Sequence, residues 1–220
     1  MILRCQRSIE AEAISNNKLY PVILYDLQKT THVRRYLIVD DCRSLSWHCS
    51  DRFDLISDKS ECYIEEGSDE INIRYIHKEL AGEDFFSTYY MEDERSLIIK
   101  LKLEEVLISV LANEMTAKTL YDNLKIIGFK DDNTEIVLKA FLNNADSFEL
   151  SEFAERIYEE VTELEGYIID VIVEKLSQHK APEIESLFIE ISMWYQEDTK
   201  ETLNIIGKYL GALKDILNQN

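Results

Sequence analysis

The chain has 220 residues, and its 43 acidic against 24 basic side chains give a formal net charge of −19. A surface this acidic excludes nonspecific binding to nucleic acid or to anionic membranes as the main activity, because both ligands are themselves negatively charged. Hydrophobic residues make up 45% of the chain, which is enough to bury a sizeable core.

The first part of the chain is predicted to form short β-strands. Short runs rich in β-branched and aromatic residues, or alternating with polar ones, indicate strands at residues 19–27, 36–39, 44–48, 53–56, 62–64 and 71–76. The first two runs are expected to pair across a turn that begins at Lys29. Pro21 predicts that the first strand lies at an edge or begins after it, because proline cannot donate to a ladder. Five or six such strands predict a small antiparallel sheet or an SH3-like barrel.

From Glu92 onward, apolar residues recur at helical spacing. In the first expected helix, one face carries Leu97, Leu101, Ile108 and Leu111. The second is expected to run from a Thr116 cap to Gly128, and the third to follow a turn at 130–132 with Asn133 as its cap. Near the end of the chain, Pro182 and Thr199 are the expected starts of two further helices.

Residues 148–176 are predicted to form one long amphipathic helix. Its apolar stripe has the three-and-four spacing of Leu150, Phe153, Ile157, Val161 and Leu164, continued to Ile172. At about 100° per residue, five carboxylates fall on the opposite face and form a ridge: Glu152, Glu155, Glu159, Glu163 and Asp170. This ridge is either a solvated face that keeps the protein soluble or a surface that meets a partner.

The two halves differ in charge and in periodicity. Residues 1–90 carry a net charge of −5, and residues 91–220 a net charge of −14. We therefore predict an α+β fold, in which a small N-terminal antiparallel β-sheet or SH3-like barrel precedes an all-α helical bundle. The expected domains are a β-rich domain with trailing helices at 1–113 and an acidic helical domain at 114–220. No internal repeat of fixed period stands out in the sequence.

Location and cysteine chemistry follow from the apolar runs. The N-terminus lacks the apolar core of a signal peptide, and the apolar runs are too short to span a bilayer, so we expect a cytoplasmic protein without membrane contact. In that compartment the four cysteines, which are Cys5, Cys42, Cys49 and Cys62, are expected to remain reduced.

A zinc site is the first chemistry to consider. Cys42, Cys49 and Cys62, together with His32 and His48, are zinc-ligand residue types. However, six residues separate Cys42 from Cys49, where zinc sites usually have two to four. We therefore expect small buried or half-buried side chains of a β-sheet at these positions, and no metal or cofactor.

The sequence also lacks the common catalytic motifs. None of the four histidines, His32, His48, His77 and His179, lies in a nucleophile motif, so each is interpreted as a surface or interface residue. The isolated glycines form no phosphate-binding loop. Trp47 and Trp194 lie among apolar neighbours and are expected in the core. We therefore expect no enzyme.

Residues 36–107 contain the segments YLIVDD, SLSWHCSDRFDLISD and DEINIRYIHKELAGEDFFSTYYMEDERSLIIKLKLEEVL, with anchors at Asp40, Asp41, Trp47, Phe53, Asp58, Phe85 and Phe86. In these segments the chain resembles a group of small bacterial proteins that are similar to toxin-immunity proteins. The resemblance implies a short β-domain followed by a helix pair, and it covers about a third of the chain. The acidic helical half lies outside it.

The sequence leaves two functional hypotheses open. The first, implied by charge and resemblance together, is a non-enzymatic inhibitor that neutralises a basic toxin or nuclease through the carboxylate ridge, without binding nucleic acid directly. The second is a regulatory or scaffolding helical module, including a viral anti-defence protein that mimics nucleic acid. The partner's identity and the oligomeric state are left open.

Overall fold

The structure is a computed structural model that describes residues 1–8, 13–82, 88–129, 134–194 and 200–217. It contains two compact units, Met1–Ala140 and Phe141–Asn220, and the division falls inside a helix. Strands and helices are segregated along the chain, so the predicted α+β fold class is confirmed. The domain ranges 1–113 and 114–220 remain a prediction, because a division by contacts does not test independent folding.

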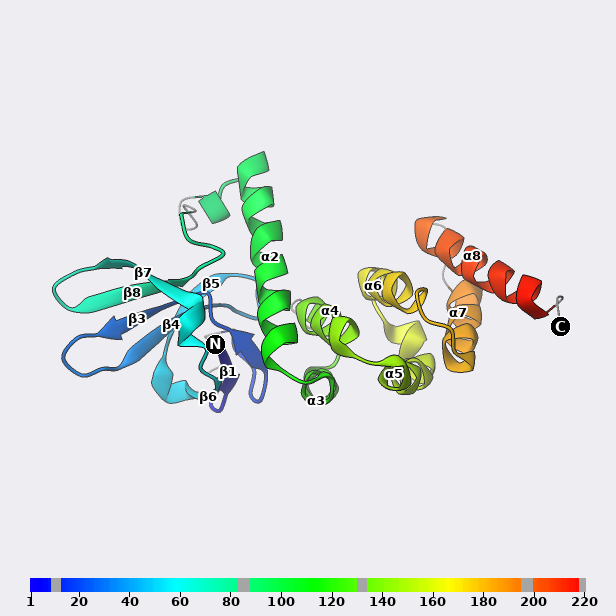
Figure 1. The fold of residues 1–220 in the computed structure, drawn as a ribbon, viewed down its shortest axis with the longest axis horizontal. Helices are drawn as coiled ribbons and strands as arrows, with labels where there is room; N and C mark the ends of the chain where they lie inside the picture. Colours follow the sequence, from blue (N-terminus) through cyan, green and yellow to red (C-terminus); the bar gives the residue numbers. More distant parts are fainter. Residues whose placement is uncertain (9–12, 83–87, 130–133, 195–199, 218–220) are drawn as a thin grey trace. The chain divides into compact units, whose positions relative to one another are not determined.

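Unit 1 contains the strands, which lie in two antiparallel sheets (Figure 1). Their bounds are β1 Ile2–Cys5, β2 Leu19–Pro21, β3 Leu24–Gln28, β4 Arg34–Val39, β5 Leu45–Cys49, β6 Phe53–Ser57, β7 Tyr63–Ser68 and β8 Asn72–His77. One sheet has the order β2-β1-β6, and the other has the order β5-β4-β3-β8-β7. The predicted edge position of Pro21 is confirmed, because β2 is an edge strand.

Two details of the sheets differ from the sequence-based expectation. The run 19–27 is two strands in different sheets, and only its second half, β3, pairs with β4, with Tyr25 opposite Tyr36. The four-residue strand β1 was not expected, since Arg4 interrupts its apolar run. It is nevertheless the central strand of its sheet, because β2 and β6 both pair with it.

Side chains from both sheets meet in one hydrophobic core. Leu3 of β1, Tyr25 of β3, Tyr36 of β4 and Tyr63 of β7 all belong to this cluster of buried residues. Tyr25 stacks on Tyr75 of β8 with ring centroids 4.8 Å apart. In the described residues both sheets are open, which favours antiparallel sheets over the SH3-like barrel.

Three helices follow in unit 1 or cross its end: α2 Glu94–Glu114, α3 Ala117–Ile127 and α4 Thr134–Asn144. Asp93 caps α2 by accepting from the Ser96 N–H. The buried face of α2 contains Ile99, Leu103 and Leu107, whereas Leu97 and Leu101 are exposed. The predicted helix is therefore present, but half of the residues expected to share one face point to solvent.

The predicted boundaries of α3 are confirmed. Thr116 accepts from the Thr119 N–H, and Gly128 ends the helix with a φ of 69°. On its buried side, Asn123 donates to the Asn17 carbonyl at 2.9 Å, which fixes the segment before β2. The Asn123 side-chain oxygen also accepts from the Leu19 N–H at 3.5 Å, so this side chain pairs with backbone groups on both sides of Lys18.

Ion pairs connect the elements of unit 1. The amino group of Met1, beside β1, donates to Glu114 at the end of α2 over 3.1 Å, and both side chains are buried. At the other side of α2, Glu104 pairs with Lys139 of α4, which also pairs with Glu135. Burial opposes the charge of Lys139, but these two hydrogen bonds raise its pKa overall.

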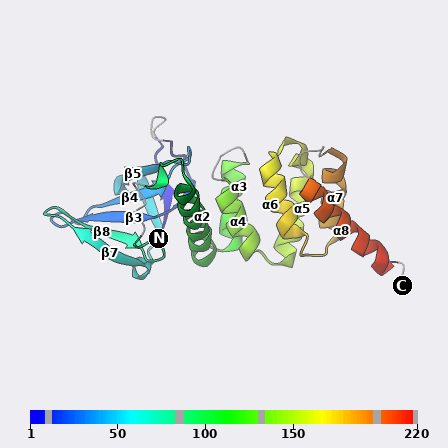
Figure 2. The ribbon, with the colours of Figure 1, turned by 90° about the horizontal axis from the view of Figure 1, so that it is seen from above.

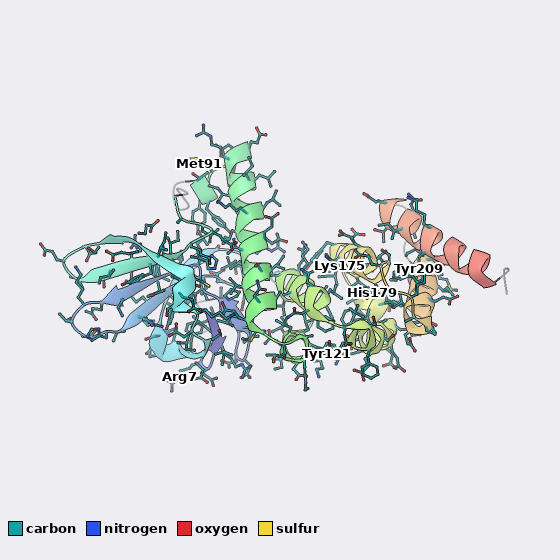
Figure 3. All side chains as sticks on the ribbon, in the orientation of Figure 1. Arg7, Met91, Tyr121, Lys175, His179 and Tyr209 are labelled. Atoms are coloured by element: carbon teal, nitrogen blue, oxygen red, sulfur yellow. The ribbon has the colours of Figure 1, made fainter. Side chains whose placement is uncertain are left out.

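Unit 2 contains the remaining helices: α5 Ser147–Glu160, α6 Gly166–Leu176, α7 Pro182–Trp194 and α8 Lys200–Leu217. Asp146 and Glu149 form a reciprocal capping box at the start of α5. Pro182 is the first residue of α7, as predicted. Tyr209 of α8, labelled in Figure 3, packs edge-on against Phe188 of α7 with ring centroids 4.9 Å apart.

A repeated burial pattern runs through the helices, although the sequence showed no repeat of fixed period. Leu120 of α3, Phe153 of α5 and Leu187 of α7 are buried at intervals of 33 and 34 residues. In the alternate helices, Leu138, Ile172 and Ile206 are buried 34 residues apart. Two-helix units of this length are typical of helical repeat proteins. The buried positions repeat, but the residue types at these positions change. The repeat is therefore not visible in the sequence.

Some predictions fall on residues that the structure does not describe. These are Phe85 and Phe86, the turn at 130–132 and the caps Asn133 and Thr199, all outside the described residues. Within the described ranges, no helix is both long and apolar enough to cross a membrane.

Candidate protein-interaction surface

The structure corrects the carboxylate ridge, because residues 148–176 are not one helix. α5 ends at Glu160, a 3₁₀ turn covers Val161–Glu163, and α6 begins at Gly166. The backbone at Leu164 and Glu165 is extended. Gly166, at the following position, lowers the helical propensity at this point.

The five predicted partner-binding residues are therefore distributed over three elements. Glu152, Glu155 and Glu159 are exposed on one face of α5, Glu163 lies in the 3₁₀ turn, and Asp170 lies on α6. Asp170 accepts a hydrogen bond from Thr202 of α8, so it contributes to helix packing. Only the three residues of α5 form a continuous acidic face.

α5 and α7 lie side by side and run in the same direction (Figure 2). Ser151 of α5 donates to Glu183 of α7 at 3.1 Å, and Tyr158 donates to Glu190 at 3.3 Å. Each bond joins residues 32 positions apart, which fixes a parallel register between the helices. Glu155 lies between Ser151 and Tyr158 on the same stripe of α5, and therefore on the edge that meets α7.

Glu190 holds two exposed aromatic side chains. Its Oε2 accepts from the Tyr158 hydroxyl, and its Oε1 accepts from the Trp194 indole N–H at 2.5 Å. Trp194 is 63% exposed and Tyr158 is 43% exposed, and the neighbouring Met193 is 70% exposed. We call Tyr158, Glu190 and Trp194 the aromatic–carboxylate cluster.

The two tryptophans differ from the expectation that both lie in the core. Trp194 is exposed because it lies past the buried stripe of α7, which ends at Ile191. Trp47 is half-buried, and the guanidinium groups of Arg35 and Arg74 lie 5.5 and 5.6 Å from its ring. Neither tryptophan is a fully buried core residue.

Unit 2 carries more net negative charge than unit 1. Residues 141–220 carry 17 acidic and 6 basic side chains, a net charge of −11, whereas residues 1–140 carry 26 acidic and 18 basic ones. A face of this sign attracts cations over roughly one Debye length, about 8 Å at physiological ionic strength.

Unit 1 offers a second surface around the start of α2. Five large apolar side chains are exposed there: Tyr90, Met91, Leu97, Ile98 and Leu101 (Figure 3 labels Met91). Beside them, a cleft of about 310 Å³ is lined by Val39, Leu103, Leu107 and Ile136, with Arg43 and Lys100 among its polar residues. Its volume is at the lower end of small-molecule sites.

The histidines and cysteines form no chemical centre in the part of the chain that the structure describes. No group of three or more His, Cys, Asp or Glu side chains there is placed to hold a metal ion, and the four cysteines form no disulfide. Cys42 and Cys49 are exposed, which corrects the expectation that they are buried or half-buried. His48 and His77 are buried, which corrects their interpretation as surface residues. His48 is the one buried residue of β5, whereas Ile76 and His77 are consecutive buried residues at the end of β8.

The described anchors of the family resemblance include two residues that stabilise the fold. Asp40 accepts from the N–H groups of Cys42 and Ser44 and so fixes the turn between β4 and β5. Asp41 accepts from Ser15, Lys18 and Tyr20. In these contacts, Asp40 and Asp41 stabilise the fold of unit 1.

Comparison with protein-family models, with curated proteins and with solved structures finds no match to this chain. The sequence analysis missed Tyr158 and Glu190. The four-residue spacing of Glu190 and Trp194 on a predicted helix was the one available signal, since residues at that spacing are neighbours. The contribution of Tyr158 depends on the register of α5 against α7, which sequence periodicity does not contain.

Proposed function

We propose that this chain is a non-enzymatic cytoplasmic protein that binds and inhibits a basic protein, as an immunity protein does with a toxin or nuclease. The observation that carries the proposal is the α5–α7 surface. There, α5 exposes Glu152, Glu155 and Glu159 together with Tyr158, and Glu190 joins Tyr158 to the exposed Trp194. Exposed aromatic residues bordered by charge are typical of protein-binding sites.

The physical basis is complementarity of charge. A basic enzyme that acts on nucleic acid has a cationic site built for phosphates, and a carboxylate face attracts such a site. Association is then fast at low salt and slows as ions screen the charges. The family resemblance in unit 1 supports the same class of function.

The test is a pull-down with the tagged full chain from its native lysate at low and high salt, followed by reconstitution with the purified partner. We expect a basic partner that salt releases, and whose own activity falls in the complex. Charge reversal of Glu152, Glu155 and Glu159 to Lys should abolish this binding. A matched triple reversal of Glu61, Glu65 and Glu70, which are exposed in unit 1, should preserve most of it.

Three results would contradict the proposal. One is a partner that binds equally well at high salt. Another is an equal loss of binding in the two triple variants, which would mean that only total charge matters. The third is full activity of the partner in the complex, which would show binding without inhibition.

The repeated burial pattern favours a second candidate, a regulatory or scaffolding module. Helical repeats use extended surfaces to hold partners together, and the α5–α7 pairing is of that kind. A scaffold would bind two proteins at once without lowering the activity of either. The same reconstitution separates the two candidates, because only the inhibitor changes the partner's activity.

A further inference from the structure

We propose that the aromatic–carboxylate cluster binds an arginine side chain of the basic partner. This inference rests on the proposed function and specifies which chemical group the surface recognises. It concerns Tyr158, Glu190 and Trp194, together with the exposed Glu155 and Met193 beside them.

The hydrogen bonds of Glu190 orient the cluster in advance. One oxygen accepts from Tyr158 on α5 and the other accepts from Trp194 one helical turn further on α7. A carboxylate offers about four lone-pair positions, so two remain for a ligand. Because both rings are already fixed to the carboxylate, a ligand loses little free energy in ordering them.

The ring faces supply the second part of the site. The indole N–H of Trp194 is engaged with Glu190, while 63% of the side chain stays exposed. Indole is the aromatic ring that binds cations best through its face. Because the Trp194 indole N–H is hydrogen-bonded to Glu190, a cation on the ring face is also close to the Glu190 carboxylate. The ring face and the carboxylate therefore attract the same cationic group.

Charge complementarity selects a cationic occupant. Glu155 lies one turn before Tyr158 on the same stripe of α5, and Glu183 lies two turns before Glu190 on α7. On the other side, Met193 and Ile189 are exposed and apolar. The cluster therefore combines negative charge with apolar surface, which matches a charged head on a methylene stem.

Arginine fits these groups better than lysine. Its planar guanidinium stacks on an indole ring and at the same time donates two parallel N–H groups to a carboxylate. The lysine ammonium is a compact, strongly hydrated charge that meets the carboxylate but gains less from the ring. Two ligands of equal charge should therefore bind with different affinities.

The experiment uses the full chain labelled with ¹⁵N and two blocked heptapeptides, in which glycines alternate with either three arginines or three lysines. The chain has two tryptophans, so its NMR spectrum contains two indole N–H signals, and Trp47→Phe assigns them. At low salt, the arginine peptide should shift the Trp194 signal and bind about two- to five-fold more tightly than the lysine peptide.

The variants separate charge from recognition. Trp194→Leu should bind both peptides equally, and Glu190→Gln should weaken the arginine peptide by about two- to five-fold. Glu174→Gln makes the same charge change on α6 outside the cluster and should keep the arginine preference. Circular dichroism confirms that each variant is folded, and the substituted residues are at least partly exposed.

The possible failures are distinguishable. If both peptides bind equally in a salt-dependent way while the Trp194 signal stays in place, the inference is overturned and the charge-led function stands. A preference for arginine that survives Trp194→Leu overturns it as well. If neither cationic peptide binds at low salt, the expectation of a basic partner fails together with the inference.

Discussion

Hydrogen bonds from three side chains of unit 1 converge on Asp41. Its carboxylate accepts from the Lys18 ammonium at 2.7 Å and from the hydroxyls of Tyr20 and Ser15 at 2.6 and 2.7 Å. Lys18 is only 1% exposed, and the Asp41 carboxylate is one of the groups that balance its buried charge. Removing one partner of a buried pair costs far more than the pair itself contributes.

We therefore predict that Asp41→Ala lowers the free energy of unfolding by about 3 kcal/mol. Urea denaturation followed by circular dichroism measures this change. Asp122→Ala is the control, because Asp122 pairs with Lys118 and Lys125 on the surface of α3, where such pairs contribute less than about 1 kcal/mol. Equal losses in the two variants would show that the Lys18 pair has no special importance.

His77 makes the stability of unit 1 depend on pH. Burial lowers the pKa of His77 below its ordinary value of 6.5, and the nearby Glu79 opposes this effect. The ring packs edge-on against Tyr63 with centroids 5.3 Å apart. The folded state therefore holds the imidazole neutral, while the unfolded chain binds a proton as the pH falls through 6.5.

The sign of the effect follows from this proton balance. The contribution of His77 is complete above pH 6.5 and is lost as the pH falls from 6.5 through the lower folded-state pKa. We predict a smaller loss of stability between pH 7.5 and 5.5 in His77→Gln than in the unchanged chain, measured by urea denaturation at each pH. Parallel pH profiles of the two proteins would refute this assignment.

At the scale of elements, the capping box of α5 sets the start of the acidic face. Asp146 accepts from the N–H groups of Phe148 and Glu149, and the Glu149 side chain accepts from the Asp146 N–H. Asp146→Ala should lower the free energy of unfolding of unit 2 by about 1 kcal/mol. Asp146→Ser should lower it much less, because serine is also a good N-cap. Hydrogen exchange of the first turn of α5 measures this loss. Unchanged exchange in the alanine variant would contradict the role of the cap.

Helix existence was predictable from the sequence, but helix faces and breaks were less so. Thr116, Gly128 and Pro182 act locally, through caps and dihedral angles, and the structure places them as predicted. The exposed Leu97 and Leu101 are different, because α2 is apolar around much of its circumference and its neighbours, β1, β2 and α4, select the buried side. Periodicity does not contain that selection.

The break between α5 and α6 shows a second limit. Val161 and Ile168 are buried, and they continue the apolar stripe of α5 by spacing alone. A helix and a helix–turn–helix therefore satisfy the same pattern over this stretch. Gly166 was the local signal for the turn, and it was outweighed by the length of the stripe. The aromatic–carboxylate cluster shares this limit, since it exists only after α5 and α7 have paired.

At the scale of the whole molecule, charge is unequally divided between the units. Unit 2 has a net charge of −11 in 80 residues, and unit 1 has −8 in 140. Like charges repel most strongly in the compact state, so repulsion among the carboxylates of unit 2 lowers the stability of its folded state. A cationic partner removes this repulsion, and so does salt.

Raising NaCl from about 20 to 300 mM shortens the screening distance from roughly 20 to 6 Å. We predict that hydrogen exchange in the full chain then slows several-fold in α5 and α7 and changes little in β3 and β4, which serve as the internal control. Equal slowing in both units would mean that the excess charge of unit 2 is already balanced within the fold. The same salt range should weaken binding of a basic partner, so the two measurements must move in opposite directions if the carboxylates act as proposed. If salt slows hydrogen exchange in α5 and α7 but does not weaken the binding of any partner, the acidic residues serve only to keep the protein soluble.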